Sequence, residues 1–168
     1  MYMFDINKFS NQYSVRFLKE NDVDLIIDLC KPNTIFYQYT IARPTKEDLL
    51  EDMKLTPPGV DLKDKYYVGY FDGNTLVAVL DLIDGWPSKE VAYIGFFMMN
   101  INYQGKNIGS SIINELSAYL KSSKFQYIRL AVDDGNPQSL HFWHKNGFEL
   151  VKSVTTDEGI RHVLEKRL

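Results

Sequence analysis

The sequence has a single cysteine, Cys30, so no intrachain disulfide can form and a zinc site built from cysteines is excluded. It also lacks an excess of basic residues. Nineteen Lys and Arg stand against 22 Asp and Glu, which gives a formal net charge of −3. Proteins that bind nucleic acid generally use positive charge to attract the phosphate backbone. We therefore expect no nucleic acid among the partners, although a local basic site for a phosphorylated ligand stays open.

Long apolar runs are absent as well. No stretch approaches the ~18 apolar residues of a membrane-spanning helix, so no membrane partner is expected. Residues Met1–Asp5 lack the basic start and the apolar segment of a signal peptide, which makes the cytoplasm the expected location. The chain has 168 residues, of which 45% are hydrophobic and 24% charged. This balance predicts one globular domain over residues 1–168.

Apolar periodicity and turn residues predict an alternation of strands and helices. Asp72-Gly73-Asn74 has the composition of a hairpin turn between two strands. The expected elements are strands at 13–18, 65–71, 76–83, 90–100, 125–132, 148–154 and 161–168, and helices at 23–29, 44–55, 108–120 and 137–146. This order predicts an α/β domain with a central mixed, mostly antiparallel sheet flanked by helices. The almost entirely apolar strand at 90–100 should be central and covered on both faces.

The loop Tyr103–Ser110 joins this central strand to the helix that follows it. The first turn of a helix has free backbone N–H groups, and the helix dipole favours negative charge there. Gly105 and Gly109 let the backbone approach a ligand closely because they have no Cβ. Three residues separate them and no Lys-Ser/Thr follows, so the segment is neither a P-loop nor a dinucleotide fingerprint. A phosphate cradle and a plain helix start with two turn glycines both remain open.

A second segment, Asp133–Phe148, has the signals of a short helix. Asn136 suits the N-cap and Pro137 suits the first helical position. Gly147 suits the left-handed residue that ends a helix, with Phe148 folding back as its apolar contact. Each of these residues has an adequate structural explanation by itself.

Together, the two segments resemble the Gcn5-related N-acetyltransferase (GNAT) superfamily. That family carries a Q/R-x-x-G-x-G/A loop after its fourth strand and, later, an N-x-x-A/S-x-x-F-Y-x-x-x-G-F helix. Gln104–Gly109 matches the loop and Asn136–Phe148 matches the helix, and the order of the expected elements matches from end to end. The resemblance implies the GNAT fold. Two positions depart from the pattern. Asn107 stands for the middle glycine, although asparagine tolerates positive φ, and Trp143 stands where many members have a tyrosine.

The resemblance implies acetyl-coenzyme A as the co-substrate, without a metal. Backbone N–H groups of the loop would hold its pyrophosphate, and the central strand would pair with its pantetheine arm. Asn136 would hydrogen-bond the pantetheine, although helix capping explains that residue equally well. The implied coenzyme-binding residues are Phe97, Met98, Met99, Gln104, Gly105, Lys106, Asn107, Ile108, Gly109, Ser110, Asn136, Ser139, Phe142 and Trp143.

The implied reaction is direct transfer of the acetyl group to a primary amine. A backbone N–H near Met99 would polarise the thioester carbonyl, and a carboxylate, or a water held by one, would take the amine proton. Many members place a glutamate on the fourth strand. The nearest position here is Tyr93, with Glu90 three residues earlier. Asp81 and Asp84, at the end of the third strand, are rival bases.

Protonation of the leaving thiol has no clear donor in the sequence. An indole does not ionise usefully in water, so Trp143 cannot supply the proton. His144, Tyr93 or a water could do so. His141 and His144 lie three apart on one helix turn, but no third ligand is evident nearby, so no metal is expected.

The acceptor is not named by any motif. Phe36, Tyr37, Tyr39 and Trp86 are candidates to line its pocket, or else they cap the core. A small amine or aminoglycoside, an amino acid, a polyamine and a protein amine are all open, as is a homodimer. A rival interpretation of the chain is a coenzyme A-binding sensor or regulatory module without catalysis, since Trp143 removes one general acid.

Overall fold

The computed structural model describes residues 3–38, 44–123 and 125–168. Its strands are β1 (Ser14–Phe17), β2 (Lys65–Asp72), β3 (Thr75–Asp84), β4 (Val91–Met99), β5 (Tyr127–Asp133), β6 (Glu149–Thr156) and β7 (Gly159–Arg167). Its α-helices are α1 (Val23–Cys30), α2 (Lys46–Asp52), α3 (Ile108–Ser122) and α4 (Pro137–Lys145). Single turns of 3₁₀ helix occur at Ile6–Lys8, Glu20–Asp22, Phe36–Gln38, Leu62–Asp64 and Ile101–Tyr103.

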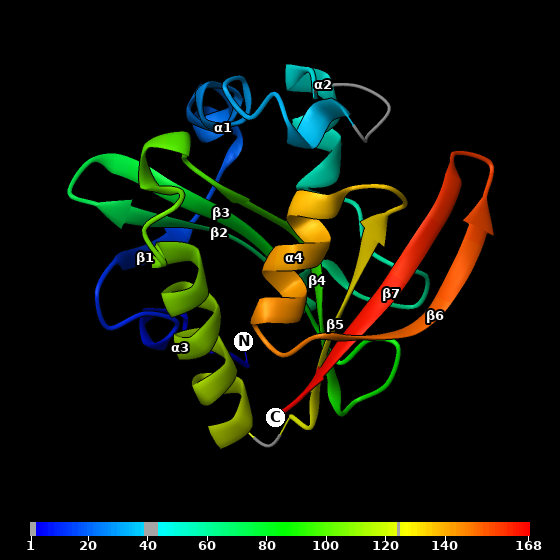
Figure 1. Cartoon of the computed structure of the whole chain (residues 1–168). Coiled ribbons are helices and arrows are strands. Elements are labelled where there is room, and N and C mark those ends of the chain that lie inside the picture. The colour runs from blue at the N-terminus through cyan, green and yellow to red at the C-terminus, as the bar shows by residue number, and fades with distance from the viewer. Residues whose placement is uncertain (1–2, 39–43, 124) are drawn as a thin grey trace.

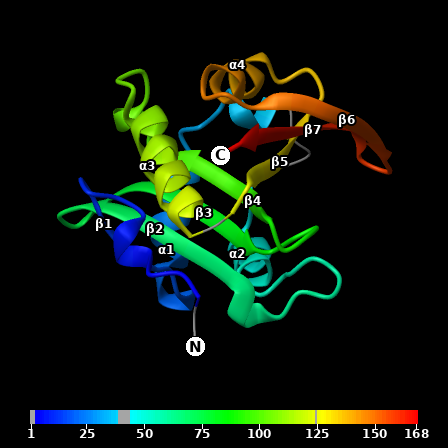
Figure 2. The same cartoon turned by 90° about the horizontal axis from the view of Figure 1, so that it is seen from below.

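The seven strands form one sheet in the order β1-β2-β3-β4-β5-β7-β6, which places β4 at the centre (Figure 1). Neighbouring strands are antiparallel except for β4 and β5, which are parallel and are joined through α3. The hairpin of β6 and β7 extends beyond the rest of the sheet, as Figure 2 shows from below. The fold class predicted from the sequence is therefore confirmed.

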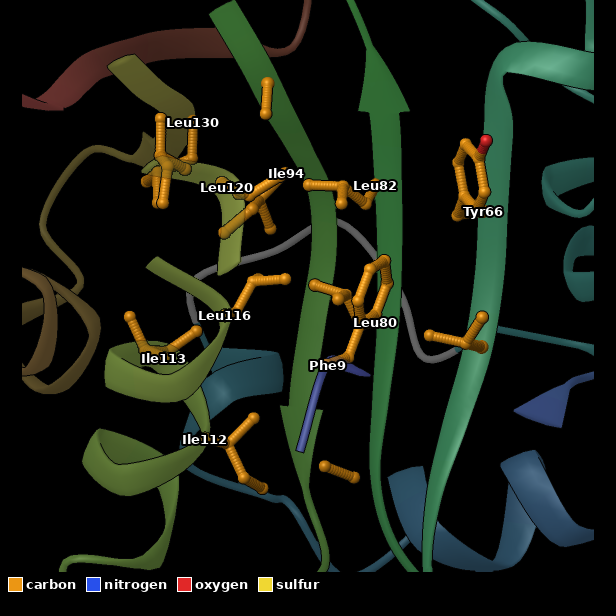
Figure 3. Packing of buried hydrophobic residues seen from close by; sticks show 14 of the residues in the cluster. Phe9, Tyr66, Leu80, Leu82, Ile94, Ile112, Ile113, Leu116, Leu120 and Leu130 are labelled. Carbon is orange, nitrogen blue, oxygen red and sulfur yellow. The ribbon is translucent and has the colours of Figure 1, made fainter. Parts of the chain in front are cut away.

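The two faces of the sheet carry separate cores. The helices α3 and α4 cover one face, where apolar residues of α3 recur at helical spacing against alternate residues of the strands. Figure 3 labels side chains of this core, namely Phe9, Tyr66, Leu80, Leu82, Ile94, Ile112, Ile113, Leu116, Leu120 and Leu130. The helices α1 and α2 cover the other face through Ile26, Leu29 and Leu49. The sheet thus separates two apolar cores.

Element boundaries differ from the prediction by one or two residues at most ends, and by three at the end of α2. The helix predicted at 44–55 spans only Lys46–Asp52, because Thr45 caps it in a reciprocal capping box with Asp48 and Pro44 lies outside. The strand predicted from Phe125 begins at Tyr127. Among the described helices, none combines the length and apolar character needed to cross a membrane.

Candidate active site

The central strands β4 and β5 lie side by side for only part of their length. Val91–Ile94 pair with Tyr127–Leu130, and both strands then continue without pairing to each other. The carbonyl of Met99 accepts from side chains instead, with Asn33 Nδ2 at 3.1 Å and Gln104 Nε2 at 3.2 Å. This edge of β4 is therefore open to an extended ligand, which could add to it as a further strand.

The alternation of β4 determines which backbone groups line the opening. The N–H of Asn100 donates to the carbonyl of Val77 at 2.8 Å, so it faces β3. Because backbone groups alternate in direction along a strand, those of Met98 also face β3, and those of Phe97 and Met99 face the opening. Of the three residues expected from the family resemblance, Phe97 is the one whose backbone N–H and C=O are best placed for a ligand.

The loop before α3 has the backbone of an anion site. Gly105 has a φ of 71°, and Asn107 has a φ of 59° in the left-handed region. The expectation that asparagine would permit this turn is therefore confirmed. The N–H of Ser111 donates to the Asn107 carbonyl at 3.0 Å, which leaves the preceding N–H groups in the unpaired first turn of the helix. Those groups belong to Ile108, Gly109 and Ser110.

Two lysines lie beside this loop. Lys106 Nζ donates to the carbonyl of Asn102 at 3.1 Å, and Lys145 Nζ, from the last turn of α4, donates to Asn107 Oδ1 at 2.8 Å. Sequence reasoning missed Lys145, because a lysine at the end of a helix is ordinary there. Together the two ammonium groups add positive charge to the free N–H groups of α3, as a pyrophosphate site requires.

Gln104 and Ser110 make side-chain hydrogen bonds that hold neighbouring elements together. Gln104 donates its N–H to Ile101 at 3.3 Å and its side-chain Nε2 to Asn33 Oδ1 at 2.6 Å, so it ties the loop to the end of α1. Ser110 Oγ accepts from Asn146 Nδ2 at 3.1 Å, which ties α3 to α4. Gln104 therefore holds the loop in shape and does not offer its own N–H to a phosphate.

The residues expected from α4 form its cap and an aromatic cluster. Asn136 is buried and accepts from the N–H of Ser139 at 3.1 Å, so capping accounts for its side-chain oxygen. Phe142 stacks on Phe97 at a centroid distance of 6.0 Å and lies against Gly109, where a Cβ would meet its ring at 3.2 Å. The glycine therefore makes room for the Phe142 ring that stacks on Phe97.

Trp143 lies within the core. It is 6% exposed, and its ring contacts those of Phe97, Phe142 and Phe148 at centroid distances of 5.9, 4.9 and 5.0 Å. Burial of this ring supplies a large part of the apolar contact between α4 and the sheet.

Replacing Trp143 by alanine should lower the free energy of unfolding by about 3–5 kcal/mol, because it removes a buried ring and leaves a cavity. The measurement is equilibrium denaturation in urea, with a matched Trp86→Ala variant as control. Trp86 is only partly buried, so its loss should cost much less. Equal losses for the two variants would contradict the assignment of Trp143 to the core.

A large pocket lies on the opposite face of the sheet, beside α2 and the segment that follows α1. Its volume is about 730 Å³. Its wall includes Phe36, Tyr37 and Trp86, as the sequence suggested, while Tyr39 lies outside the described residues. The lining residues are Phe36, Tyr37, Pro44, Leu49, Asp52, Leu55, Thr56, Pro57, Lys65, Tyr67, Asp81, Ile83, Trp86, Tyr93, Gly95, Phe96, Glu158 and Arg161.

A buried carboxylate forms the floor of this pocket. Asp81 Oδ2 accepts from Lys65 Nζ at 2.7 Å, and the Lys65 side chain is only 3% exposed. The second oxygen, Asp81 Oδ1, is buried and has no hydrogen-bond partner among the described residues. Burial raises the pKa of Asp81, Lys65 opposes this shift, and Asp52 adds to it. An unpaired buried oxygen is costly, so a donor that reached it would stabilise the site.

The carboxylate lies over a bulge in β4. Asp81 pairs with Phe96 and Leu82 pairs with Ile94, so Gly95 is the extra residue on β4. A Cβ on Gly95 would be 2.7 Å from Asp81 Oδ2. The bulge begins where β4 parts from β5, so the carboxylate and the open edge of β4 meet at one point of the sheet.

Of the other predicted acid–base residues, one lies near the Asp81 carboxylate and three lie away from it. Tyr93 lines the pocket, packs against Trp86 at 4.8 Å, and has a pKa raised by burial. Asp84 is not among the lining residues, because alternation along β3 directs it to the face opposite Asp81. Glu90 is exposed before β4 and accepts from Ser88 Oγ at 2.7 Å.

His144 is not among the residues that line the pocket. Its Nδ1 is 2.9 Å from the carbonyl oxygen of Phe148, and the residue is exposed. Within the described residues, no group of three His, Cys, Asp or Glu side chains is arranged to hold a metal ion.

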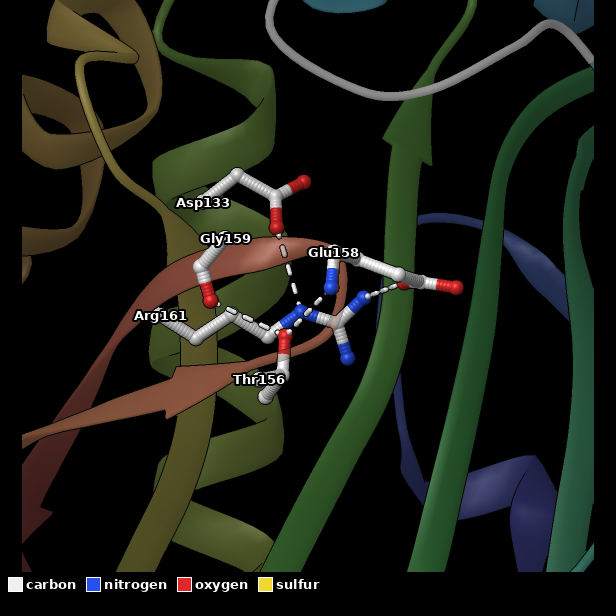
Figure 4. Close-up of polar contacts among 5 residues, drawn as sticks. All are labelled: Asp133, Thr156, Glu158, Gly159 and Arg161. Carbon is white, nitrogen blue, oxygen red and sulfur yellow. Dashed lines mark hydrogen bonds and ion pairs between the residues drawn. The ribbon is translucent and has the colours of Figure 1, made fainter.

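The turn between β6 and β7 closes one side of the pocket. Arg161 donates from Nε to Asp133 Oδ1 at 3.2 Å and from Nη2 to Glu158 Oε2 at 2.8 Å (Figure 4). Thr156 Oγ1 donates to the Gly159 carbonyl at 2.9 Å and steadies the turn itself. These contacts tie the hairpin to the end of β5. Sequence reasoning treated this segment only as a turn and missed its place in the pocket wall.

The structure thus combines a central sheet that opens beside a helix N-terminus with a separate pocket across the sheet. The family model described as the acetyltransferase (GNAT) family matches residues 32–148. The chain therefore belongs to the GNAT family. No curated protein matches it.

Solved structures of acetyltransferases share this fold. An acetyltransferase from Thermus thermophilus has a TM-score of 0.74 at 19% identity, over 94% of this chain and 97% of that one. The PaiA N-acetyltransferase from Thermoplasma acidophilum, solved with coenzyme A, has a TM-score of 0.66 at 21% identity, over 93% and 99%. The enzyme AAC(6')-Ib, solved with ribostamycin and coenzyme A, has a TM-score of 0.68 at 16% identity, over 94% of each chain.

Proposed function

We propose that the protein transfers the acetyl group of acetyl-coenzyme A directly to a primary amine, with Asp81 as the general base. The observation that carries this proposal is the unpaired Oδ1 of Asp81 at the point where β4 parts from β5. A carboxylate oxygen there has no structural partner among the described residues. Asp81 lines the pocket, so a small movement of its carboxylate would let it accept a hydrogen bond from the attacking amine.

The donor would bind on the α3 and α4 side. The free N–H groups at the start of α3, with Lys106 and Lys145, would hold its pyrophosphate. The open edge of β4, at the backbone of Phe97 and the N–H of Met99, would hold its extended arm by strand addition. Complexes of the PaiA enzyme with coenzyme A, and of a phosphinothricin acetyltransferase from Sinorhizobium meliloti with acetyl-coenzyme A, are consistent with this role for the fold.

The acceptor would approach from the other face, through the pocket. Its amine nitrogen attacks the thioester carbonyl carbon, a C–N bond forms, and the C–S bond breaks. The proton released by the nitrogen passes to Asp81, directly or through a water. The N–H of Phe97, on the open edge, is the backbone donor best placed to stabilise the negative charge on the carbonyl oxygen.

The departing thiolate needs a proton that Trp143 cannot give. We assign this step to Tyr93 or to a water beside it. Burial raises the pKa of the Tyr93 phenol, so the group stays protonated at neutral pH, and it lies in the pocket wall. His144 is less suitable, because its ring lies against the Phe148 carbonyl.

The test is to incubate the protein with acetyl-coenzyme A and a broad panel of amines, and to follow free thiol together with the mass of each amine. Amine-dependent thiol release with a gain of one acetyl group supports the enzyme. Tight coenzyme binding without release for any amine would instead indicate a sensor or regulatory module.

A further inference from the structure

The pocket that contains Asp81 has a cluster of aromatic rings in its wall. Among the described lining residues these are Phe36, Tyr37, Tyr67, Trp86, Tyr93 and Phe96. Pockets for small molecules are usually apolar and aromatic, with a few polar groups that fix the orientation of the ligand. A volume of about 730 Å³ is within the range of such pockets.

Four of these rings are already held in place by one another. Phe36 and Tyr37 meet edge to face at 5.0 Å and 86°, and Trp86 and Tyr93 do so at 4.8 Å and 85°. The first pair lies on the segment after α1, and the second joins the connection before β4 to β4 itself. Rings fixed in this way present apolar surface without the entropy cost of ordering flexible side chains on binding.

The charges of the described residues around the pocket are nearly balanced. Among those residues, three carboxylates and two cations line it. Lys65 is paired with Asp81, and Arg161 is paired with Glu158, so Asp52 is the one lining carboxylate left without a cation in contact among the described residues. An acceptor with several ammonium groups would find few uncompensated carboxylates, and desolvating its remaining charges would be costly.

Few acceptor groups of the pocket lack a partner among the described residues. Within that part of the chain, Asp81 Oδ1 is buried and unpaired, and Asp52 is a second lining carboxylate without a cation in contact. Aromatic rings beside so few uncompensated acceptors match a molecule with one amine at the end of a short linker and a flat apolar body.

We infer that the acceptor is a small arylalkylamine, whose amine reaches Asp81 and whose ring packs among the aromatic side chains of the pocket. This inference rests on the proposed function for its catalytic readout, but ligand binding alone can also test it. It excludes polyamines, aminoglycosides and protein amines as the preferred acceptors.

The experiment compares kcat/KM for tryptamine and 2-phenylethylamine with the values for hexylamine, spermidine, kanamycin and a short peptide with a free N-terminus. We expect the arylalkylamines to exceed hexylamine by about tenfold or more, because ring packing adds to the apolar contact, and to exceed spermidine and kanamycin by more than that. Better turnover of hexylamine, spermidine, kanamycin or the peptide would overturn the inference while it supports the acetyltransferase.

A matched pair of variants tests the rings themselves. Trp86→Leu should lower kcat/KM for tryptamine by about tenfold, whereas Tyr127→Leu, which removes a partly buried ring outside the pocket, should lower it far less. Equal effects of the two variants would overturn the inference.

Calorimetry separates failure of the inference from failure of the proposed function. Tryptamine is titrated into the protein with coenzyme A present. If no amine releases thiol but tryptamine binds and Trp86→Leu weakens that binding, the pocket has the inferred ligand class and the catalytic proposal is wrong. Absence of both turnover and binding for the arylalkylamines overturns the inference.

Discussion

Replacing Asp81 by asparagine should lower kcat for amine acetylation by about 10²–10⁴-fold, the usual contribution of a general base. The amide keeps the shape of the side chain but cannot accept a proton. Coenzyme A affinity, measured by calorimetry, should be nearly unchanged, because the coenzyme would bind across the sheet. In the unaltered protein the rate should fall as pH drops through the pKa of Asp81. Since burial raises that pKa, this fall should lie above the range of an ordinary aspartate. The Asp81→Asn variant should not show this fall in rate.

The asparagine variant also leaves Lys65 buried without its anion, which typically costs about 3–5 kcal/mol of stability. Asp81→Asn combined with Lys65→Met is therefore the control, because it removes both charges and should regain most of the lost stability. Activity should remain low in this double variant. Recovery of activity along with stability would show that Asp81 acts only in folding.

Replacing Asn107 by aspartate should weaken coenzyme A binding by about 10- to 100-fold, because it adds a negative charge where the pyrophosphate would bind. The same change should leave the melting temperature unchanged or raise it. Aspartate tolerates the left-handed backbone, its charge suits a helix N-terminus, and Lys145 already contacts this position. The affinity for coenzyme A should thus fall while the melting temperature stays the same or rises.

The matched control is Asn107→Gly, which keeps the turn geometry and adds no charge. Calorimetry with coenzyme A, at low and at high salt, measures both variants. The loss in the aspartate variant should shrink at high salt, because ions screen the repulsion. If the glycine variant loses as much affinity as the aspartate variant, charge at this position is not the cause, and the pyrophosphate lies elsewhere.

Local signals in the sequence were sufficient for most of the fold. Apolar runs and turn residues identified the strands, and capping residues at Asn136 and Pro137 identified α4. The helix start after Asn107 was also predicted, together with its left-handed turn. These features depend on neighbouring residues, so they can be read without knowing which strands pair. Helix ends were less certain, since α2 ends three residues before Leu55, the predicted end.

The Lys65–Asp81 pair could not be predicted, because it depends on a bulge. Counting from the pairs Asp72 with Thr75 and Phe71 with Leu76, a regular hairpin would set Asp81 opposite Tyr66 and put Lys65 on the other face. A register shift after Tyr70 sets Asp81 opposite Tyr67 instead, on the same face as Lys65. The only signal was the presence of a charge in each of two apolar strands.

The bulge at Gly95 links a position on β4 to the carboxylate on β3. Any side chain on that residue would displace the carboxylate that lies 2.7 Å from its Cβ position. An aspartate at the place of Asp81 can therefore reach its position over the sheet only if the opposite strand has glycine at the bulge. The two residues form one sequence signature across two strands. Chains of this family that carry both should deprotonate their acceptors from β3, and chains with only one should have moved that task to another strand.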